Sequence, residues 1–240
     1  MPLAGHLTEL RNRLAKSMIA VALAAIVAFY FGNNLVEVLL IPFPDDVTVT
    51  QLRVLEGVSV RMKVALWGGF VMAFPVVLYH VLKFAAPALL PNERRFFFLA
   101  LPIFMGLFLI GVTFAFLILI PLVMAFLPQI LGELVTPQIS IESIVGTTVW
   151  LTICMGLVFE LPVVMYLMAR AGILNPSRVA RQRRVAILVS FIAAAVITPT
   201  GDPITMTVFG LPIWLLFEVG LIFARFAAWR RHKALAGAAG

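Results

Sequence analysis

Long apolar stretches recur along the whole chain, separated by short polar segments, and most are long enough to cross a membrane as a helix. Hydrophobic residues make up 62% of the 240 residues and charged residues 12%, and the mean hydropathy is +1.08. A soluble domain contains far fewer apolar residues. The sequence therefore predicts an all-α integral membrane protein.

The apolar stretches predict a single membrane domain of six transmembrane helices over residues 1–240. The expected spans are about 17–32, 60–82, 96–120, 144–169, 185–197 and 204–223. Helices five and six are expected to be short, because their uninterrupted apolar cores cover only about 20 Å against a hydrocarbon layer of about 30 Å. Such helices must thin the bilayer locally or extend into polar flanks.

Several segments outside these cores have local signals of their own. Leu7, Leu10 and Leu14 recur at helical spacing, which predicts a short helix in the membrane interface before the first span. A further short helix is expected at 35–40 in the first loop. Pro75 is expected to kink the second span, and Pro121 to end the third.

Basic residues fix the expected orientation. With six spans, both termini and the loops 83–95 and 170–184 share one side, and the loops 33–59, 121–143 and 198–203 share the other. All of the 18 Lys and Arg residues except Arg53, Arg61 and Lys63 fall on the side of the termini. The positive-inside rule places that side, and both termini, in the cytoplasm.

Glu160 lies within the apolar stretch 144–169, and no other charged residue occurs between Glu142 and Arg170. An ionisable side chain at the centre of a bilayer costs about 2.5 to 3.5 kcal/mol on insertion scales. Glu160 therefore needs a wet cavity, a partner or a proton. A structural alternative is a protonated side chain that is hydrogen-bonded between helices. Pro162 close by frees a backbone carbonyl for a polar partner, or simply kinks the helix.

Glu9 and Glu93 are the two acidic residues expected on the basic cytoplasmic side, apart from the interfacial Glu218. A carboxylate there provides a local site for a guanidinium group. The alternative is that each pairs locally, Glu9 with Arg13 one helical turn away and Glu93 with Arg94 or a helix start.

Ordered motifs along the chain resemble the TatC family, the multispan component of the twin-arginine protein translocase. They are the segment from His6 to Leu14, the run from Phe74-Pro75 through His80, Phe84, Pro87 and Leu89 to Glu93-Arg94-Arg95, Phe159-Glu160-x-Pro162, Thr198-Pro199 with Asp202, and Leu211-Pro212 with Phe217-Glu218. The resemblance covers roughly residues 5 to 230.

This resemblance implies a receptor for twin-arginine signal peptides and a translocase core that exports folded proteins, driven by the proton-motive force. It implies a concave, glove-like helical bundle in the cytoplasmic membrane of a bacterium or archaeon. The implied signal-peptide residues are Glu9, Leu10, Arg13, Glu93, Arg94 and Arg95.

The implied partners are TatA- and TatB-like single-span proteins and further copies of the chain. Glu160 would face the concavity, where it would meet the signal peptide or these single-span partners, and Pro162 is a further residue of this intramembrane docking site. Met206 stands where the family often has Gln, which leaves any polar contact there in doubt. Further family positions are Pro75, Pro87, Asp202 and Glu218, although Asp202 is a turn former first.

Other functional classes have little support. There is no Gly-x-Ser-x-Gly or His-Glu-x-x-His motif, and His6, His80 and His232 are too scattered for a metal site. We expect no catalysis, no cofactor and no nucleic-acid partner. The rival interpretations are a proton-coupled secondary transporter with Glu160 as its relay and a passive scaffold for other subunits.

Overall fold

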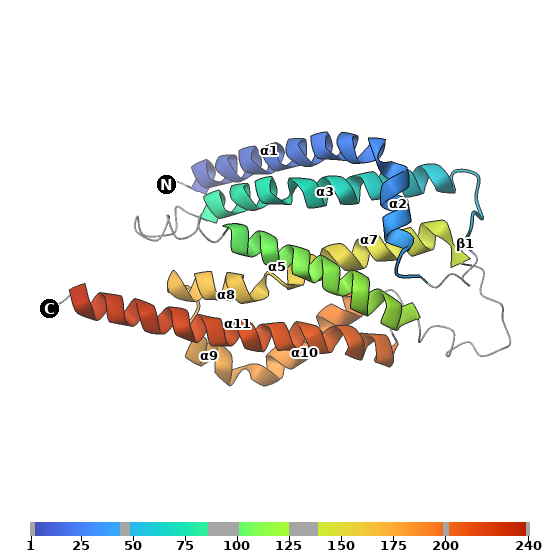
Figure 1. Cartoon of the computed structure of the whole chain (residues 1–240). Helices are drawn as coiled ribbons and strands as arrows, with labels where there is room; N and C mark the ends of the chain where they lie inside the picture. The colour runs from blue at the N-terminus through green and yellow to red at the C-terminus, as the bar shows by residue number, and fades with distance from the viewer. Residues whose placement is uncertain (1–2, 44–48, 86–100, 125–138, 199–201, 239–240) are drawn as a thin grey trace. The chain divides into compact units, whose positions relative to one another are not determined.

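The computed structural model describes residues 3–43, 49–85, 101–124, 139–198 and 202–238, with side chains for 7–43, 50–84, 101–124, 140–198 and 202–231. Helices dominate this part of the chain (Figure 1), which confirms the predicted helical membrane class. The elements are α1 (Leu3–Tyr30), α2 (Gly32–Leu40), β1 (Val49–Thr50), α3 (Glu56–Ala85), α5 (Leu101–Phe114), the π-helix η2 (Ala115–Leu119), β2 (Ile139–Ser140), α7 (Ile141–Val158), α8 (Leu161–Arg170), α9 (Pro176–Arg181), α10 (Arg183–Ile197) and α11 (Pro203–Ala238).

These elements form two compact units. Unit 1 comprises residues 1–87 and 112–153, and unit 2 comprises residues 88–111 and 154–240. The division falls within α5 and α7, so both helices contribute residues to each unit.

Five described helical segments are long and apolar enough to cross a membrane: Leu7–Tyr30, Glu56–Phe84, Leu101–Met124, Ile141–Arg170 and Pro203–Arg231. The remaining predicted span corresponds to α10, which has only 15 residues, as its short apolar stretch predicts. The expectation of a short sixth helix is wrong, because α11 has 36 residues and continues through its polar end. Its last turns are rich in Ala, Arg and Lys, which favour a helix.

In unit 1, α1 packs along α3, and the small side chains between them allow a close approach. A Cβ atom on Gly69 would lie 2.6 Å from Cα of Ala25, so this position requires glycine. Small residues at such crossings are typical of helices that pack inside membranes. A second cluster joins α2, α3 and α7 through Leu39, Val64 and Val145. A two-residue parallel pair, β1 with β2, adds to this unit.

Two of the local predictions for unit 1 are wrong. The amino-terminal segment is not a separate interfacial helix, since α1 continues from Leu3 to Tyr30 without a break. No Gly or Pro stands between Leu7 and Ser17 to interrupt it. Helix also continues past Pro121 to Met124. The π-helix just before it already departs from the ordinary bonding pattern, since the Ile120 N–H donates to the Ala115 carbonyl.

Another local prediction is confirmed: the short helix expected at 35–40 is part of α2. Pro75 lies inside α3, which continues through it, and the expected kink stays a prediction. Because proline has no N–H, the carbonyl of Val71 lacks its usual donor there.

In unit 2, α8, α9 and α10 each pack against α11. Its core consists of Met165 and Ala169 of α8 with Leu221, Ala224 and Ala227 of α11. Many large apolar side chains in both units remain exposed, for example Ile26 (69%) and Val196 (72%). A surface of this kind suits lipid rather than water.

Candidate functional site: an interrupted span around Glu160

Glu160 lies where the fourth predicted span is interrupted. α7 ends at Val158 and α8 begins at Leu161, so the expected span 144–169 is divided at Phe159 and Glu160. The Glu160 N–H donates to the Leu157 carbonyl at 3.1 Å, which is the tighter i−3 pattern. Pro162 cannot donate to the carbonyl of Val158, so the main chain cannot close an ordinary α-turn here.

The side chain of Glu160 is buried and lacks a partner. It is 7% exposed, and neither Oε1 nor Oε2 has a hydrogen-bond partner among the described residues. A buried acceptor without a donor is costly, because it has lost its water without compensation. The interruption of the span thus holds an unsatisfied carboxyl group inside unit 2.

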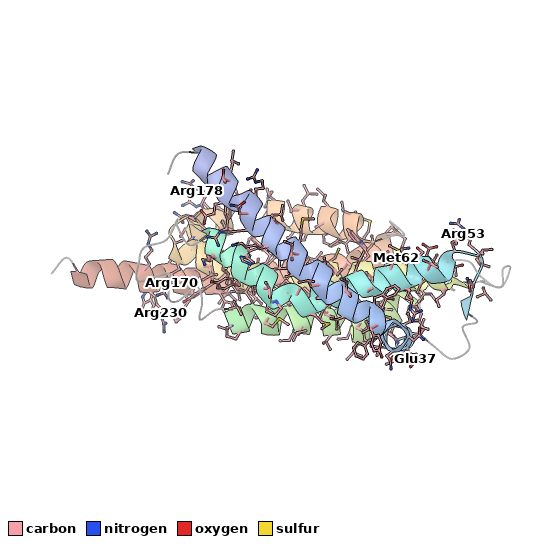
Figure 2. The ribbon with its side chains drawn as sticks, turned by 90° about the horizontal axis from the view of Figure 1, so that it is seen from above. Glu37, Arg53, Met62, Arg170, Arg178 and Arg230 are labelled. Atoms are coloured by element: carbon pink, nitrogen blue, oxygen red, sulfur yellow. The ribbon has the colours of Figure 1, made fainter. Side chains whose placement is uncertain are left out.

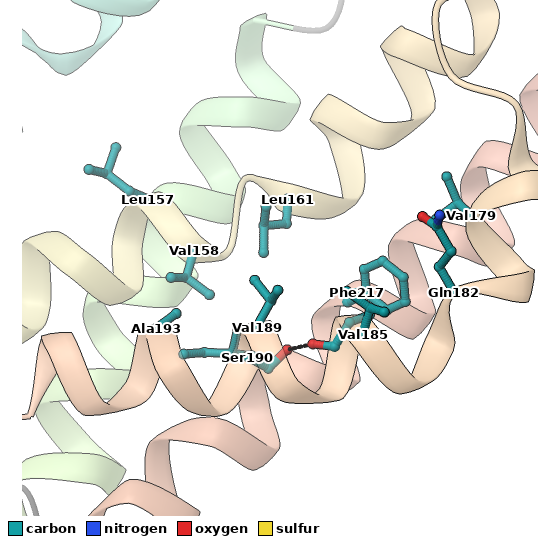
Figure 3. Close-up of a pocket in the computed structure, with 12 residues that line it drawn as sticks. Leu157, Val158, Leu161, Val179, Gln182, Val185, Val189, Ser190, Ala193 and Phe217 are labelled. Carbon is teal, nitrogen blue, oxygen red and sulfur yellow. Dashed lines mark hydrogen bonds between the residues drawn. The ribbon is translucent and has the colours of Figure 1, made fainter.

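An apolar groove lies beside this interruption (Figure 3). It has a volume of about 500 Å³ and is lined by Leu157, Val158 and Leu161 together with residues of α9, α10 and α11. Its most buried polar group, the Ser190 hydroxyl, donates to the Ala186 carbonyl of its own helix at 2.8 Å. The groove therefore presents mainly hydrocarbon.

The structure places Glu9 on α1 next to Arg13. Nε of Arg13 donates to Oε1 of Glu9 at 3.0 Å, and Nη2 donates to the same oxygen. The local pair that the sequence offered as an alternative is therefore present. Leu7, Leu10 and Leu14 on the same helix are exposed. Glu93, Arg94, Arg95 and Pro87 lie outside the described residues.

Three further family positions, Asp202, Met206 and Glu218, lie just before α11 or on it. Oδ1 of Asp202 accepts hydrogen bonds from the N–H groups of Ile204 (3.1 Å) and Thr205 (2.9 Å), so Asp202 caps this helix. The N–H of Met206 donates to the Asp202 carbonyl, and its side chain is half-buried. Oε2 of Glu218 accepts a 2.9 Å hydrogen bond from Nη2 of Arg183 at the start of α10, which forms an ion pair.

Sequence reasoning missed a polar network in unit 1. The Glu56 carboxylate accepts hydrogen bonds from the N–H groups of Leu52 (2.6 Å), Arg53 (3.0 Å) and Glu142 (3.0 Å), and from the Ser140 hydroxyl. It thereby joins the start of α3 to the start of α7. Figure 2 shows Glu37 and Arg53 at this end of unit 1.

Glu142 completes this network by pairing with Lys63 at 2.7 Å and accepting from Ser59, also at 2.7 Å. Only a weak signal in the sequence pointed to this network. Glu56 stands three residues after Arg53, the spacing at which a glutamate can accept a hydrogen bond from a backbone N–H just before a helix. Its partners from α7 are more than eighty residues away, and nothing local predicts them.

No cluster of three or more His, Cys, Asp or Glu side chains suited to a metal ion occurs within the described ranges.

Comparison with known proteins identifies the family. The model of the family "Sec-independent protein translocase protein (TatC)" matches residues 5–212. The TatC protein of Aquifex aeolicus is 33% identical over 97% of this chain and 98% of its own length. The TatC protein of Escherichia coli strain K12 is 32% identical over 94% of this chain and 88% of its own.

Solved structures agree. A crystal structure of the twin-arginine translocase receptor TatC matches with a TM-score of 0.81 at 33% identity, over 92% of this chain and 99% of that chain. A second structure of that receptor, in the detergent DDM, matches with a TM-score of 0.82 at 34% identity. With its interrupted fourth span, its ordered motifs and these matches over nearly its whole length, the chain belongs to the TatC family of multispan membrane proteins of the Sec-independent protein translocase.

Proposed function

We propose that this protein is the twin-arginine signal-peptide receptor and core subunit of a translocase that exports folded proteins, driven by the proton-motive force. The observation that carries the proposal is the likeness, over more than nine tenths of the chain, to solved structures of a twin-arginine translocase receptor. The charge pattern of the sequence is consistent with it, since carboxylates are rare on the basic side.

Glu9 is the first acceptor for the signal peptide. Its carboxylate lies on α1, and the exposed leucines Leu7, Leu10 and Leu14 form a separate side of the same helix. A signal peptide combines arginines with an apolar segment, so a helix with an acid on one side and leucines on another offers a contact to each part. Arg13 holds the carboxylate in the free protein, and an incoming guanidinium exchanges with it or shares it.

Glu93 is the second acceptor, with Arg94 and Arg95 as supporting residues. Two acids at separate points of the chain would each receive one guanidinium of a twin-arginine pair. Arginine presents a planar fork that binds a carboxylate through two parallel hydrogen bonds, whereas lysine presents a point charge. This difference explains why paired arginines would be preferred over paired lysines.

Glu160 takes part in the assembly of the translocase with its single-span partner proteins. A buried carboxyl group without a donor is stabilised by any partner that brings one. We assign this role to the TatA- and TatB-like single-span proteins. Pro162 keeps the helix interrupted beside Glu160, because it cannot donate to the carbonyl of Val158. Met206 is a further residue of the docking surface. The short α10 would thin the bilayer nearby and lower the cost of gathering single-span helices there.

The orientation follows from the basic residues. Both termini and the predicted loops 83–95 and 170–184 lie in the cytoplasm, so Glu9 meets substrates before export. The membrane is the cytoplasmic membrane, and several copies of the chain assemble in the receptor complex.

Export of a folded reporter tests this proposal. The gene is expressed in a bacterium whose own TatC gene has been deleted, and a fluorescent protein that folds in the cytoplasm carries a twin-arginine signal. We expect export that stops when the arginines become lysines or the proton gradient is collapsed. Absence of export by a stably inserted protein, together with proton-coupled solute uptake into proteoliposomes, would overturn the proposal in favour of a transporter.

A further inference from the structure

Unit 2 also contains a polar cavity, separate from the apolar groove beside Glu160, where two spans end. It has a volume of about 450 Å³ and is formed by the end of α8, the α8–α9 turn, the start of α9 and the segment 225–231 of α11. Asn175 lines it from the turn, Ser177 from the first turn of α9, and Arg225 and Arg231 from α11. No acidic side chain is among its lining residues.

Gly172 in the α8–α9 turn allows Arg231 into this cavity. Its φ of +77° belongs to the left-handed region that favours glycine. A Cβ atom at Gly172 would overlap the guanidinium of Arg231. The turn therefore brings bare backbone against the arginine side chain, and the absence of a side chain at Gly172 makes room for the charged group.

Among the described residues, the two arginines of the cavity lack a partner, whereas three arginines nearby have one. Arg183 pairs with Glu218, Arg170 donates to the hydroxyl of Tyr166, and Arg230 stacks on the ring of Phe226. Within the described part of the chain, neither Arg225 nor Arg231 has a hydrogen bond or an ion pair.

An anion is the ligand that this arrangement fits. A guanidinium group stays charged and binds phosphate oxygens through two parallel hydrogen bonds. The hydroxyl of Ser177 and the amide of Asn175 add neutral donors, since Oδ1 of Asn175 is already occupied by the N–H groups of Ser177 and Arg178. The hydrogen-bond donors and positive charges of the cavity therefore match a phosphate group.

The position of the cavity favours phosphate at a membrane surface. The two apolar segments that border it end at Arg170 and Arg231. Figure 2 shows Arg170, Arg178 and Arg230 at this end of unit 2. Next to Arg225, α11 exposes Ile222, Phe223 and Phe226, a surface on which acyl chains can lie. Basic pockets between helices at a membrane surface are suited to anionic headgroups.

We propose that Arg225 and Arg231, with Asn175 and Ser177, form a binding site for a phosphate group, carried by an anionic phospholipid headgroup or present as the free anion. When bound by lipid, the site anchors the end of α11 to the α8–α9 turn.

The test measures binding to the intact purified protein in a phosphate-free, uncharged detergent. The probes are short-chain phosphatidylglycerol, short-chain phosphatidylcholine and inorganic phosphate, and the readout is the thermal unfolding temperature over a concentration series. The double variant Arg225→Gln/Arg231→Gln removes the two guanidinium groups proposed to bind phosphate. Arg230→Gln combined with Arg178→Gln is the matched control, because it removes the same charge from the same region without touching the cavity lining.

Phosphatidylglycerol is expected to stabilise the unmodified protein and the control alike, and to bind the Arg225→Gln/Arg231→Gln variant at least tenfold more weakly. Competition by inorganic phosphate with equal affinity would assign the site to the free anion, and weak competition would assign it to the lipid. Equal weakening in both double variants would overturn the proposal, since the attraction would then come from general charge. It would also be overturned if neither phosphatidylglycerol nor inorganic phosphate bound the unmodified protein.

Discussion

The indole Nε1 of Trp67 donates a 2.9 Å hydrogen bond to Oγ1 of Thr152, which joins α3 to α7 within unit 1. Thr152 is fully buried, and its hydroxyl proton goes to its own helix, to the carbonyl of Thr148 at 2.7 Å. The Thr152 hydroxyl thus accepts a hydrogen bond from α3 and donates one within α7. This polar contact lies between apolar spans, where water offers no alternative partner.

Thr152→Val should lower the free energy of unfolding by about 1 to 2 kcal/mol, because the Trp67 N–H loses its acceptor in a buried position. Thr148→Val is the matched control. Thr148 is equally buried, and its Oγ1 has no hydrogen-bond partner in the described structure, so its loss should cost little. Denaturant unfolding in detergent measures both; equal losses would contradict the role of the Trp67–Thr152 bond.

Glu160→Leu should stabilise the isolated protein by about 1 to 3 kcal/mol, because it removes a buried carboxyl group without a partner. The same substitution should reduce export, because the group proposed to bind the single-span partners is lost. Glu218→Leu breaks an exposed ion pair with Arg183 and should change stability by less than about 1 kcal/mol. Unfolding and reporter export are measured together. Normal export by Glu160→Leu would show that the carboxyl group is dispensable.

Gly172→Ala should cost about 1 to 2 kcal/mol of stability, because an alanine at φ +77° is strained and its Cβ displaces Arg231. Gly106→Ala on α5 is its counterpart: it lies inside a helix with no atom within 4 Å of the added methyl, so stability should rise by about 0.5 to 1 kcal/mol. Thermal unfolding of the pair checks the prediction, which fails if the two substitutions act in the same direction.

Lengthening α10 by one turn of Leu and Ala adds about 6 Å to a helix of 15 residues. If its shortness thins the bilayer for partner assembly, export should fall while signal-peptide binding stays unchanged. A turn inserted in the same way near the end of α11, beyond Arg231, is the control, since that segment lies past the apolar span. Normal export with the longer α10 would rule out thinning as its purpose.

The sequence predicted the membrane class, the short α10 and the helix in the first loop, because these follow from the length and spacing of apolar residues. It did not predict the length of α1 or α11. Charged residues such as Arg11 and Arg225 look like boundaries in a hydropathy pattern, yet they are good helix formers and the backbone continues through them.

The candidate site was predictable only in part. Glu160 stands out because a lone acid in an apolar stretch is costly, and Pro162 marks the irregular backbone beside it. The hydrogen bonds of Glu56 with α7 and the approach of Arg231 to Gly172 depend on residues far apart in the chain. Such pairs are set by packing, which a single sequence does not reveal.

Direct binding of a labelled twin-arginine signal peptide to the purified protein is the measurement that matters most. We expect the twin-arginine peptide to bind at least tenfold more tightly than its twin-lysine counterpart, and Glu9→Gln and Glu93→Gln each to weaken it by a similar factor, since each removes one charged acceptor. Glu37→Gln, which removes an acid predicted to lie on the opposite side of the membrane, is the control and should bind normally. Equal affinity for the two peptides, or binding unaffected by Glu9→Gln and Glu93→Gln, would contradict the assignment of these acids as the signal-peptide receptor site.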